Sequence, residues 1–386
     1  MEVYPPVTMK TISGLLLFHP VIIFSKVPNQ TFIGGYFMIV KNLLVVGVVA
    51  GFASAAAAQD SKGSWSIGGR VRVDAEQSTT EVELGGVKGT SKSSEVSLNR
   101  AQFTLNGSRD GHGLALTYYA DSNELFTAVI SHKFSDMITA HFGRMRVLAQ
   151  SVENSYEEID QYLWSWAKMH APSNSEGVRL DFAFAGDHAV SVQAVEGVSM
   201  IGEGEDALEF EHNGGLTTAL QYRGNLNNGM VKPIVTYTQV RTSARKSGAV
   251  DYSNGYMNQL GLGAQISLSG AAVDLEYDSG TMLKDKADKD AKDATMTSIV
   301  AQVKYPVGAT TPFLKVTSDS MKLGADKGVG DQTGMNLALG VEHALDASCR
   351  LHAVYTNQAG TTEAGEGAKD TKMTTTGFNF GVTASM

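Results

Sequence analysis

The sequence predicts an all-β protein whose strands close into a transmembrane antiparallel β-barrel of about 16 strands, within a range of roughly 14 to 18. Apolar and polar residues alternate along many short segments, and short turns alternate with long polar loops. Charged residues make up 18% of the chain, against about 25% in a typical soluble domain. In hydrocarbon each unpaired backbone group is costly, so a sheet is stable there only when it closes and leaves no edge.

The composition argues against several other classes of protein. With 41 glycines and only 8 prolines among 386 residues, the chain is neither collagen-like nor a proline-rich linker. Cys349 is the only cysteine, so the chain can form no intrachain disulfide and no cysteine-based zinc site. The formal net charge is -9 and the basic residues are scattered, whereas nucleic-acid binding needs a basic stripe. We therefore expect no cofactor and no nucleic-acid partner.

The N-terminal region predicts export. From Met38 the chain has a lysine, an apolar run over residues 43–52 and a small-residue string that ends at Ala58, the order of a secretory signal peptide. A membrane-spanning helix is the alternative, but it needs about 20 apolar residues. We expect residues 38–58 to be the signal peptide, residues 1–37 to be an upstream extension absent from the mature protein, and residues 59–386 to form the barrel.

The first strand shows the two-faced pattern most clearly. Between Trp65 and Val73, apolar residues fall on one face, and Ser66, Arg70 and Arg72 fall on the other. About seventeen segments can be assigned in this way. The others are Arg100–Asn106, Leu114–Ala120, Leu125–His132, Ile138–Arg146, Val178–Ala185, His188–Val195, Ala207–His212, Leu216–Arg223, Val231–Val240, Gln259–Leu268, Ala272–Asp278, Thr297–Tyr305, Pro312–Thr317, Met335–His343, Cys349–Thr356 and Thr374–Ala384.

The connections between these strands indicate a barrel with two different rims. Short turns are expected at residues 135–136, 186–187, 269–270 and 346–347, and long polar loops at residues 78–94, 279–294, 318–334 and 358–372. Short turns at one rim and long loops at the other are typical of outer-membrane barrels. A large soluble β-sandwich is the alternative, but aromatic residues recur at the strand ends, as interfacial girdles require.

Several segments, taken in order, resemble the early strands of Gram-negative general porins. They are residues 98–107, 113–120, 128–136 and 138–144, and residues 376–384 resemble the family's closing strand. The resemblance implies an outer-membrane channel for passive diffusion of small hydrophilic solutes and ions. It also implies a homotrimer surrounded by outer-membrane lipid and recognised by the outer-membrane assembly machinery. One departure is the C-terminus, Ser385–Met386, where the family usually ends in an aromatic residue.

Four arginines on early strands are candidates for one wall of a pore constriction: Arg70, Arg72, Arg100 and Arg144. The first three lie opposite apolar residues in the strand alternation, so they face the lumen if the apolar residues face lipid. Arg144 shares its face with Phe142, so it enters the pore only if the strand bulges near Gly143 or has already passed into the loop.

A stretch of 30 residues between Arg146 and Gly177 is the candidate for the opposite wall. Its acidic residues are Glu153, Glu157, Glu158 and Asp160. Long loops are usually functional, and in general porins the equivalent loop folds into the barrel and narrows it. Acids facing arginines would set a transverse field across the constriction. Alternatively, Tyr162, Trp164 and Trp166 belong to an additional strand.

The sequence gives little support for catalysis or metal binding. Nine histidines are scattered without a zinc-protease motif, so we expect a protein that is not an enzyme. Residues 284–292 alternate lysines and aspartates but lack the glycine and terminal glutamate of a calcium loop. The alternative to a channel is a structural or adhesive barrel with a plugged lumen, which would carry bulky, interlocked residues on its inner face.

Overall fold

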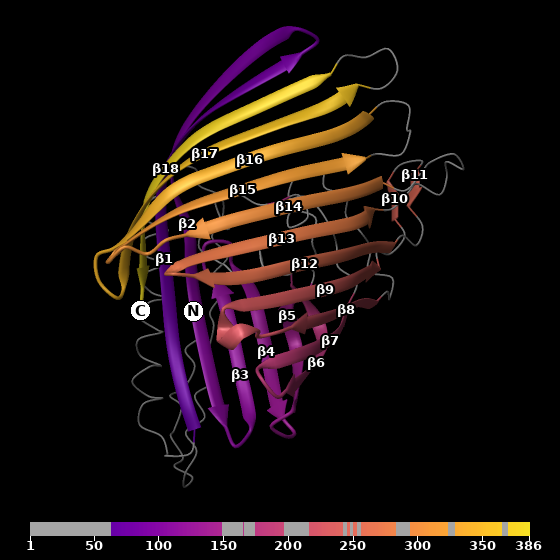
Figure 1. The fold of residues 1–386 in the computed structure, drawn as a ribbon, viewed down its shortest axis with the longest axis vertical. Helices are drawn as coiled ribbons and strands as arrows, with labels where there is room; N and C mark the ends of the chain where they lie inside the picture. The colour runs from indigo at the N-terminus through magenta and orange to yellow at the C-terminus, as the bar shows by residue number, and fades with distance from the viewer. Residues whose placement is uncertain are drawn as a thin grey trace, which may run out of the picture. The chain divides into compact units, whose positions relative to one another are not determined.

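The computed structural model describes residues 63–148, 165, 174–196, 216–241, 245–247, 250–252, 256–282, 294–322, 329–364 and 370–386. These residues form a closed antiparallel barrel of sixteen strands, which confirms the predicted fold class (Figure 1). The expected upstream extension, the signal peptide and the candidate strand Ala207–His212 lie outside the described residues. Within the described residues, no helix is long and apolar enough to cross a membrane.

Each strand of the barrel pairs with its neighbours in sequence, and the first pairs with the last. The strands are β1 (Gly63–Leu84), β2 (Val87–Arg109), β3 (His112–Tyr119), β4 (Glu124–Lys133), β5 (Ile138–Arg146), β6 (Asn174–Phe184), β7 (His188–Glu196), β8 (Leu216–Arg223), β9 (Val231–Arg241), β12 (Tyr256–Leu268), β13 (Ala271–Met282), β14 (Ala294–Lys304), β15 (Thr310–Lys322), β16 (Val329–Ala344), β17 (Cys349–Ala364) and β18 (Thr371–Ser385). β10 (Arg245–Ser247) and β11 (Val250–Tyr252) form a separate small hairpin, and η2 (Asn227–Gly229) is a single 3-10 turn.

The barrel closes along a seam between β1 and β18. Their register runs from Arg70 opposite Ser385 to Leu84 opposite Thr371. The last residue takes part, because Met386 N donates to Gly69 O at 3.0 Å and Gly69 N donates to Met386 O at 3.2 Å. The sheet therefore has no free edge at the seam, as hydrocarbon requires.

The predicted two-faced strands are present. On β13, Leu275 and Tyr277 are exposed on the outer face, whereas Asp274, Glu276 and Asp278 are buried on the inner face. Other strands of the barrel repeat the pattern, with exposed apolar side chains outside and polar side chains inside. An apolar outer surface is the one suited to lipid.

The expected loop over residues 78–94 is instead the upper part of a long hairpin. β1 and β2 stay paired up to Leu84 and Val87, around Gly85 and Gly86 with φ values of 60° and 84°. Positive φ at both central residues is what a type I′ hairpin turn needs. Hydroxyls link the strands, for example Ser78 Oγ to Ser93 Oγ at 2.7 Å. This segment was expected to be a loop because it lacks an apolar face.

Two other expected loops are also shorter than predicted, because strands occupy part of each. Strands extend into residues 318–334 and 358–372, leaving gaps only after Lys322 and Ala364. The pairing that starts in the barrel continues into these segments, from Ser318 opposite Met335 to Met321 opposite Gln332 and from Gln358 opposite Asn336 to Thr362 opposite Gln332. The four expected short turns, by contrast, all lie between paired strands.

Candidate functional site

Three of the predicted arginines meet on the inner face of β1 and β2. Arg72 lies directly opposite Arg100, and Arg70 lies opposite Gln102. The register shifts by one residue after Arg72, which leaves Asn99 as an extra residue on β2. This bulge keeps Arg100 beside Arg72 and turns the Asn99 side chain toward Asp74.

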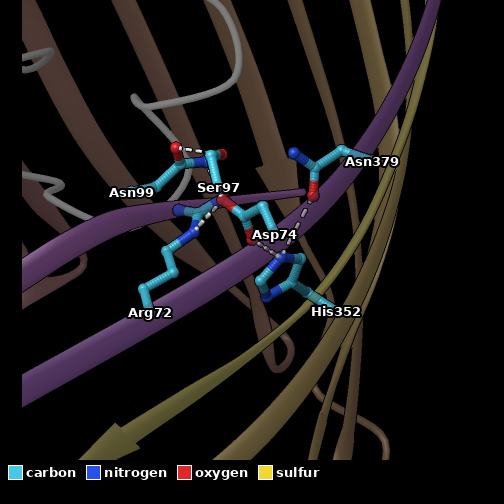
Figure 2. A network of polar contacts seen from close by, with 6 residues as sticks. All are labelled: Arg72, Asp74, Ser97, Asn99, His352 and Asn379. Carbon is cyan, nitrogen blue, oxygen red and sulfur yellow. Dashed lines mark hydrogen bonds and ion pairs between the residues drawn. The ribbon is translucent and has the colours of Figure 1, made fainter. Parts of the chain in front are cut away.

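Asp74 is the centre of a buried polar network that the sequence analysis missed (Figure 2). Arg72 Nε donates to Asp74 Oδ2 at 2.7 Å, and Asn99 Nδ2 donates to the same oxygen. On the other carboxylate oxygen, His352 Nε2 lies 2.6 Å from Oδ1, and it also lies 3.2 Å from Asn379 Oδ1. The network therefore joins β1, β2, β17 and β18 across the seam, with Asp74 fully buried.

Gly381 on β18 makes room for this network. A Cβ at that position would collide with Asp74 Oδ1 and with Val73 O, and it would reach His352 Nε2. Two of these contacts are the atoms of the Asp74–His352 pair, and the third is backbone that cannot move without disturbing the sheet. Glycine is thus the residue that lets the carboxylate and the imidazole meet at the seam.

Arg72 has a different environment from the one expected. An arginine that faces a water-filled lumen is expected to be wetted and to have no buried partner, but Arg72 is 3% exposed and paired with Asp74. Removing one member of a buried ion pair leaves the other charge uncompensated, which destabilises proteins by about 3–5 kcal/mol.

We therefore expect Arg72→Ser to lower the stability of the folded barrel by about 3 kcal/mol, while Arg100→Ser loses only a cation–π contact worth about 1 kcal/mol. The temperature at which unheated protein loses its folded gel mobility measures the difference. Equal stability of the two variants would contradict the importance assigned to the Arg72–Asp74 pair.

Arg144 does not join the other three. The pairing of β5 with β4 and β6 continues through Gly143 without a register shift, although Gly143 has φ 116°. Arg144 therefore keeps the face of Phe142, which is exposed. Its guanidinium pairs with Glu124 Oε1 at 3.1 Å.

The chain after β5 turns onto the inner wall. Val147 and Leu148 are buried, and a side chain of β7 holds this segment at two points. Leu148 N donates to Gln193 Oε1 at 2.9 Å, and Gln193 Nε2 donates to Arg146 O at 2.9 Å. Thr238 on β9 donates its hydroxyl to Leu148 O. The long loop thus begins on the inner side, as the resemblance implied, but Glu153, Glu157, Glu158 and Asp160 lie outside the described residues.

These three bonds form a clasp made of Gln193 and Thr238. We expect Gln193→Ala combined with Thr238→Val to release the start of the loop and to change single-channel conductance by about twofold or more, as for a loop that narrows a pore. Thr238→Ser keeps the hydroxyl and should conduct like the unmodified protein. Unchanged conductance in the double variant would contradict a role of the clasp in narrowing the barrel.

An acidic wall, also missed from the sequence, lies on the inner face of β13. It consists of Asp274, Glu276 and Asp278, all of them buried, and the strand order places β13 opposite β3 in the barrel. Asp319 on β15 extends it and accepts hydrogen bonds from Ser298 Oγ at 2.5 Å and Thr317 Oγ1 at 3.2 Å. The signal in the sequence was the alternation Asp-Leu-Glu-Tyr-Asp over residues 274–278.

No group of three or more histidine, cysteine, aspartate or glutamate side chains in the described part of the chain is arranged to hold a metal ion. The candidate site consists of charged side chains on the inner face of the barrel. Arg70, Arg72 and Arg100 lie at the seam, and the carboxylates of the acidic wall lie on β13. Such an arrangement can orient a passing solute and select between ions.

Comparisons with known proteins address the fold. No protein-family model and no curated protein matches the sequence. Among solved structures, the outer membrane channel DcaP of Acinetobacter baumannii is similar with a TM-score of 0.60 and 12% identity, over 85% of this chain and 99% of that one. The trimer form of OmpT, an outer membrane protein of Vibrio cholerae, has a TM-score of 0.59 and 14% identity, over 84% and 100%.

A third similar structure is an anion-selective porin from Comamonas acidovorans, with a TM-score of 0.56 and 14% identity, over 84% of this chain and 100% of that one. Identities this low establish similarity of fold alone. The chain has the porin-like fold of outer-membrane β-barrels.

Proposed function

We propose that the protein is a general porin of a Gram-negative outer membrane, a water-filled channel for passive diffusion of small hydrophilic solutes and ions, and not an enzyme. The observation that carries this proposal is the charged inner face of the barrel, with arginines at the seam and carboxylates on β13. Charged groups are stable on the inner face of a barrel only where water or partners compensate them. A transverse field at a narrow section is the arrangement that charge-selective pores use.

Single-channel recording in planar lipid bilayers tests the proposal. We expect purified, folded protein to produce stepwise conductance, and liposomes that contain it to swell in solutions of small sugars. A plugged structural or adhesive barrel would fold in detergent but conduct no ions and admit no sugars. That outcome would overturn the proposed function and leave the fold intact.

We further propose that the protein is a homotrimer inserted in outer-membrane lipid by the assembly machinery. The trimer form of the Vibrio cholerae protein has the same fold, which supports this assembly. Chemical cross-linking of the protein in native membranes should give a band at three times the mass of one chain, and a monomeric band alone would contradict the trimer.

Export requires the processing that the N-terminal sequence suggests. We propose that residues 38–58 are the signal peptide, so intact-mass measurement of envelope-purified protein should place the mature N-terminus between Ala57 and Ser61. Mature protein that retained residues 1–37 would contradict both the signal peptide and the upstream extension.

A further inference from the structure

Four side chains from consecutive strands β2 to β5 form a stack beside the arginine cluster. The guanidinium carbon of Arg100 lies 5.0 Å from the centre of the Tyr119 ring. Tyr119 is stacked on Phe126 with the ring centres 4.5 Å apart and the planes inclined by 26°. The guanidinium carbon of Arg146 lies 5.6 Å from the centre of the Phe126 ring. Two cations thus enclose two aromatic rings.

A bulge in β4 explains why Phe126 takes part. Thr117 pairs with Thr127, but Tyr118 pairs with Leu125, so Phe126 is an extra residue between them. Tyr119 is on the inner face because it pairs with Gln102, which lies opposite Arg70. Since Phe126 stacks on Tyr119, the bulge turns its ring to the inner face as well. Bulges commonly redirect one side chain in this way at functional sites.

The Arg100 end of the stack opens on a polar cavity of about 350 Å³ on the inner side of the seam. The cavity is lined by Arg72, Asn99 and Arg100 together with Glu76, Ser78 and Gln358. Its volume is within the range of small-molecule sites. Arg72 is already paired with Asp74. We therefore assign the binding of an incoming anion to Arg100.

We infer that this cavity and the adjoining stack bind small carboxylates attached to a flat aromatic ring. A guanidinium presents a planar edge of N–H donors that matches a carboxylate with two parallel hydrogen bonds. The ring of such a solute adds a cation–π contact with the guanidinium that the aromatic pair holds in place, which a saturated ring of the same size cannot make. The stack fixes Arg100 in position, so little side-chain freedom is lost on binding.

Glu76 makes it possible to test whether the site prefers a negatively charged solute. Glu76 lines the same cavity, and its negative charge opposes an anion that Arg100 attracts. Glu76→Gln should therefore strengthen binding of an aromatic carboxylate, while Arg100→Lys, which keeps the charge but loses the planar edge, should weaken it.

The inference rests on the proposed channel for access to the site, so its test uses two separate readouts. Binding of benzoate, cyclohexanecarboxylate and acetate to folded protein in detergent is measured by calorimetry, which requires no conduction. Block of ion current by the same three acids is measured in bilayers. The variants are Tyr119→Leu with Phe126→Leu, Arg100→Lys and Glu76→Gln. Tyr118→Leu is the matched control, because Tyr118 is the adjacent tyrosine on the opposite face of β3 and bonds to Asn123.

We expect benzoate to bind about tenfold more tightly than cyclohexanecarboxylate, and the double aromatic variant to remove that preference. Arg100→Lys should weaken benzoate about tenfold, Glu76→Gln should tighten it, and Tyr118→Leu should leave it unchanged. Equal affinity for benzoate in all variants, or no binding, would overturn the inference even if the protein conducts ions. Benzoate binding without conductance would uphold the site and overturn the channel.

Discussion

Gly381→Ala is expected to prevent most of the protein from folding into the closed barrel. The added Cβ collides with the Asp74 carboxylate and with a backbone oxygen of β1, and it reaches the imidazole of His352. The seam can then close only by giving up the buried Asp74–His352 contact. Loss of a buried hydrogen bond that leaves its partner unsatisfied removes about 1–3 kcal/mol, and more for a charged group such as the Asp74 carboxylate, a large share of the stability of an ordinary domain.

Gly360→Ala is the matched control for this substitution. Gly360 also lies in a strand beside the seam, but its nearest atom to an added Cβ is Thr333 O at 3.6 Å, an ordinary contact. The fraction of unheated protein that migrates in the folded position on gels, measured against temperature, compares the two variants. If both fold to the same extent and melt together, the close approach at Gly381 does not matter for closure.

Arg70→Ser combined with Arg100→Ser is expected to shift the reversal potential toward cations, with the permeability ratio changing by roughly threefold or more, because local charge at the narrowest section governs which ions cross. Arg72 is kept in this variant, since its partner Asp74 would otherwise be left as a buried charge. Reversal potentials under a salt gradient are the measurement.

The control neutralises charge elsewhere on the chain. Asp285, Asp288 and Asp290 belong to the expected external loop over residues 279–294 and lie outside the described residues. Screening beyond about 8 Å at physiological salt should make their replacement by asparagine nearly silent. Equal shifts in both variants, or no shift in either, would contradict the proposal that Arg70 and Arg100 line a constriction.

The alternation of residues was enough to predict the barrel and the face of three arginines. Period-two patterns depend only on neighbouring residues, so Arg70, Arg72 and Arg100 could be assigned to the inner face before any pairing was known. The same reasoning should have found Asp74, which is two residues from Arg72 and therefore shares its face. The carboxylates on β13 carried the same local signal.

Long-range pairing could not be predicted in this way. His352 meets Asp74 across 278 residues of sequence, and only the register of β1 with β18 and of β18 with β17 brings them together. The Tyr119–Phe126 stack depends on one extra residue in β4. The position of such a bulge cannot be recognised from the residue alternation of one strand, because it is defined by the pairing with the partner strand. The hairpin over residues 78–94 was missed because its strands lack an apolar face.

The pairing of the first strand with the last also sets an order in time. β1 is made early, yet its edge stays unpaired until β18 has been synthesised and laid beside it. Contacts between residues so far apart in sequence form slowly, because a long chain segment must first be closed into a loop. A copy that lacked β18 would keep an open edge along β1, so the barrel can close only after β18 has been added.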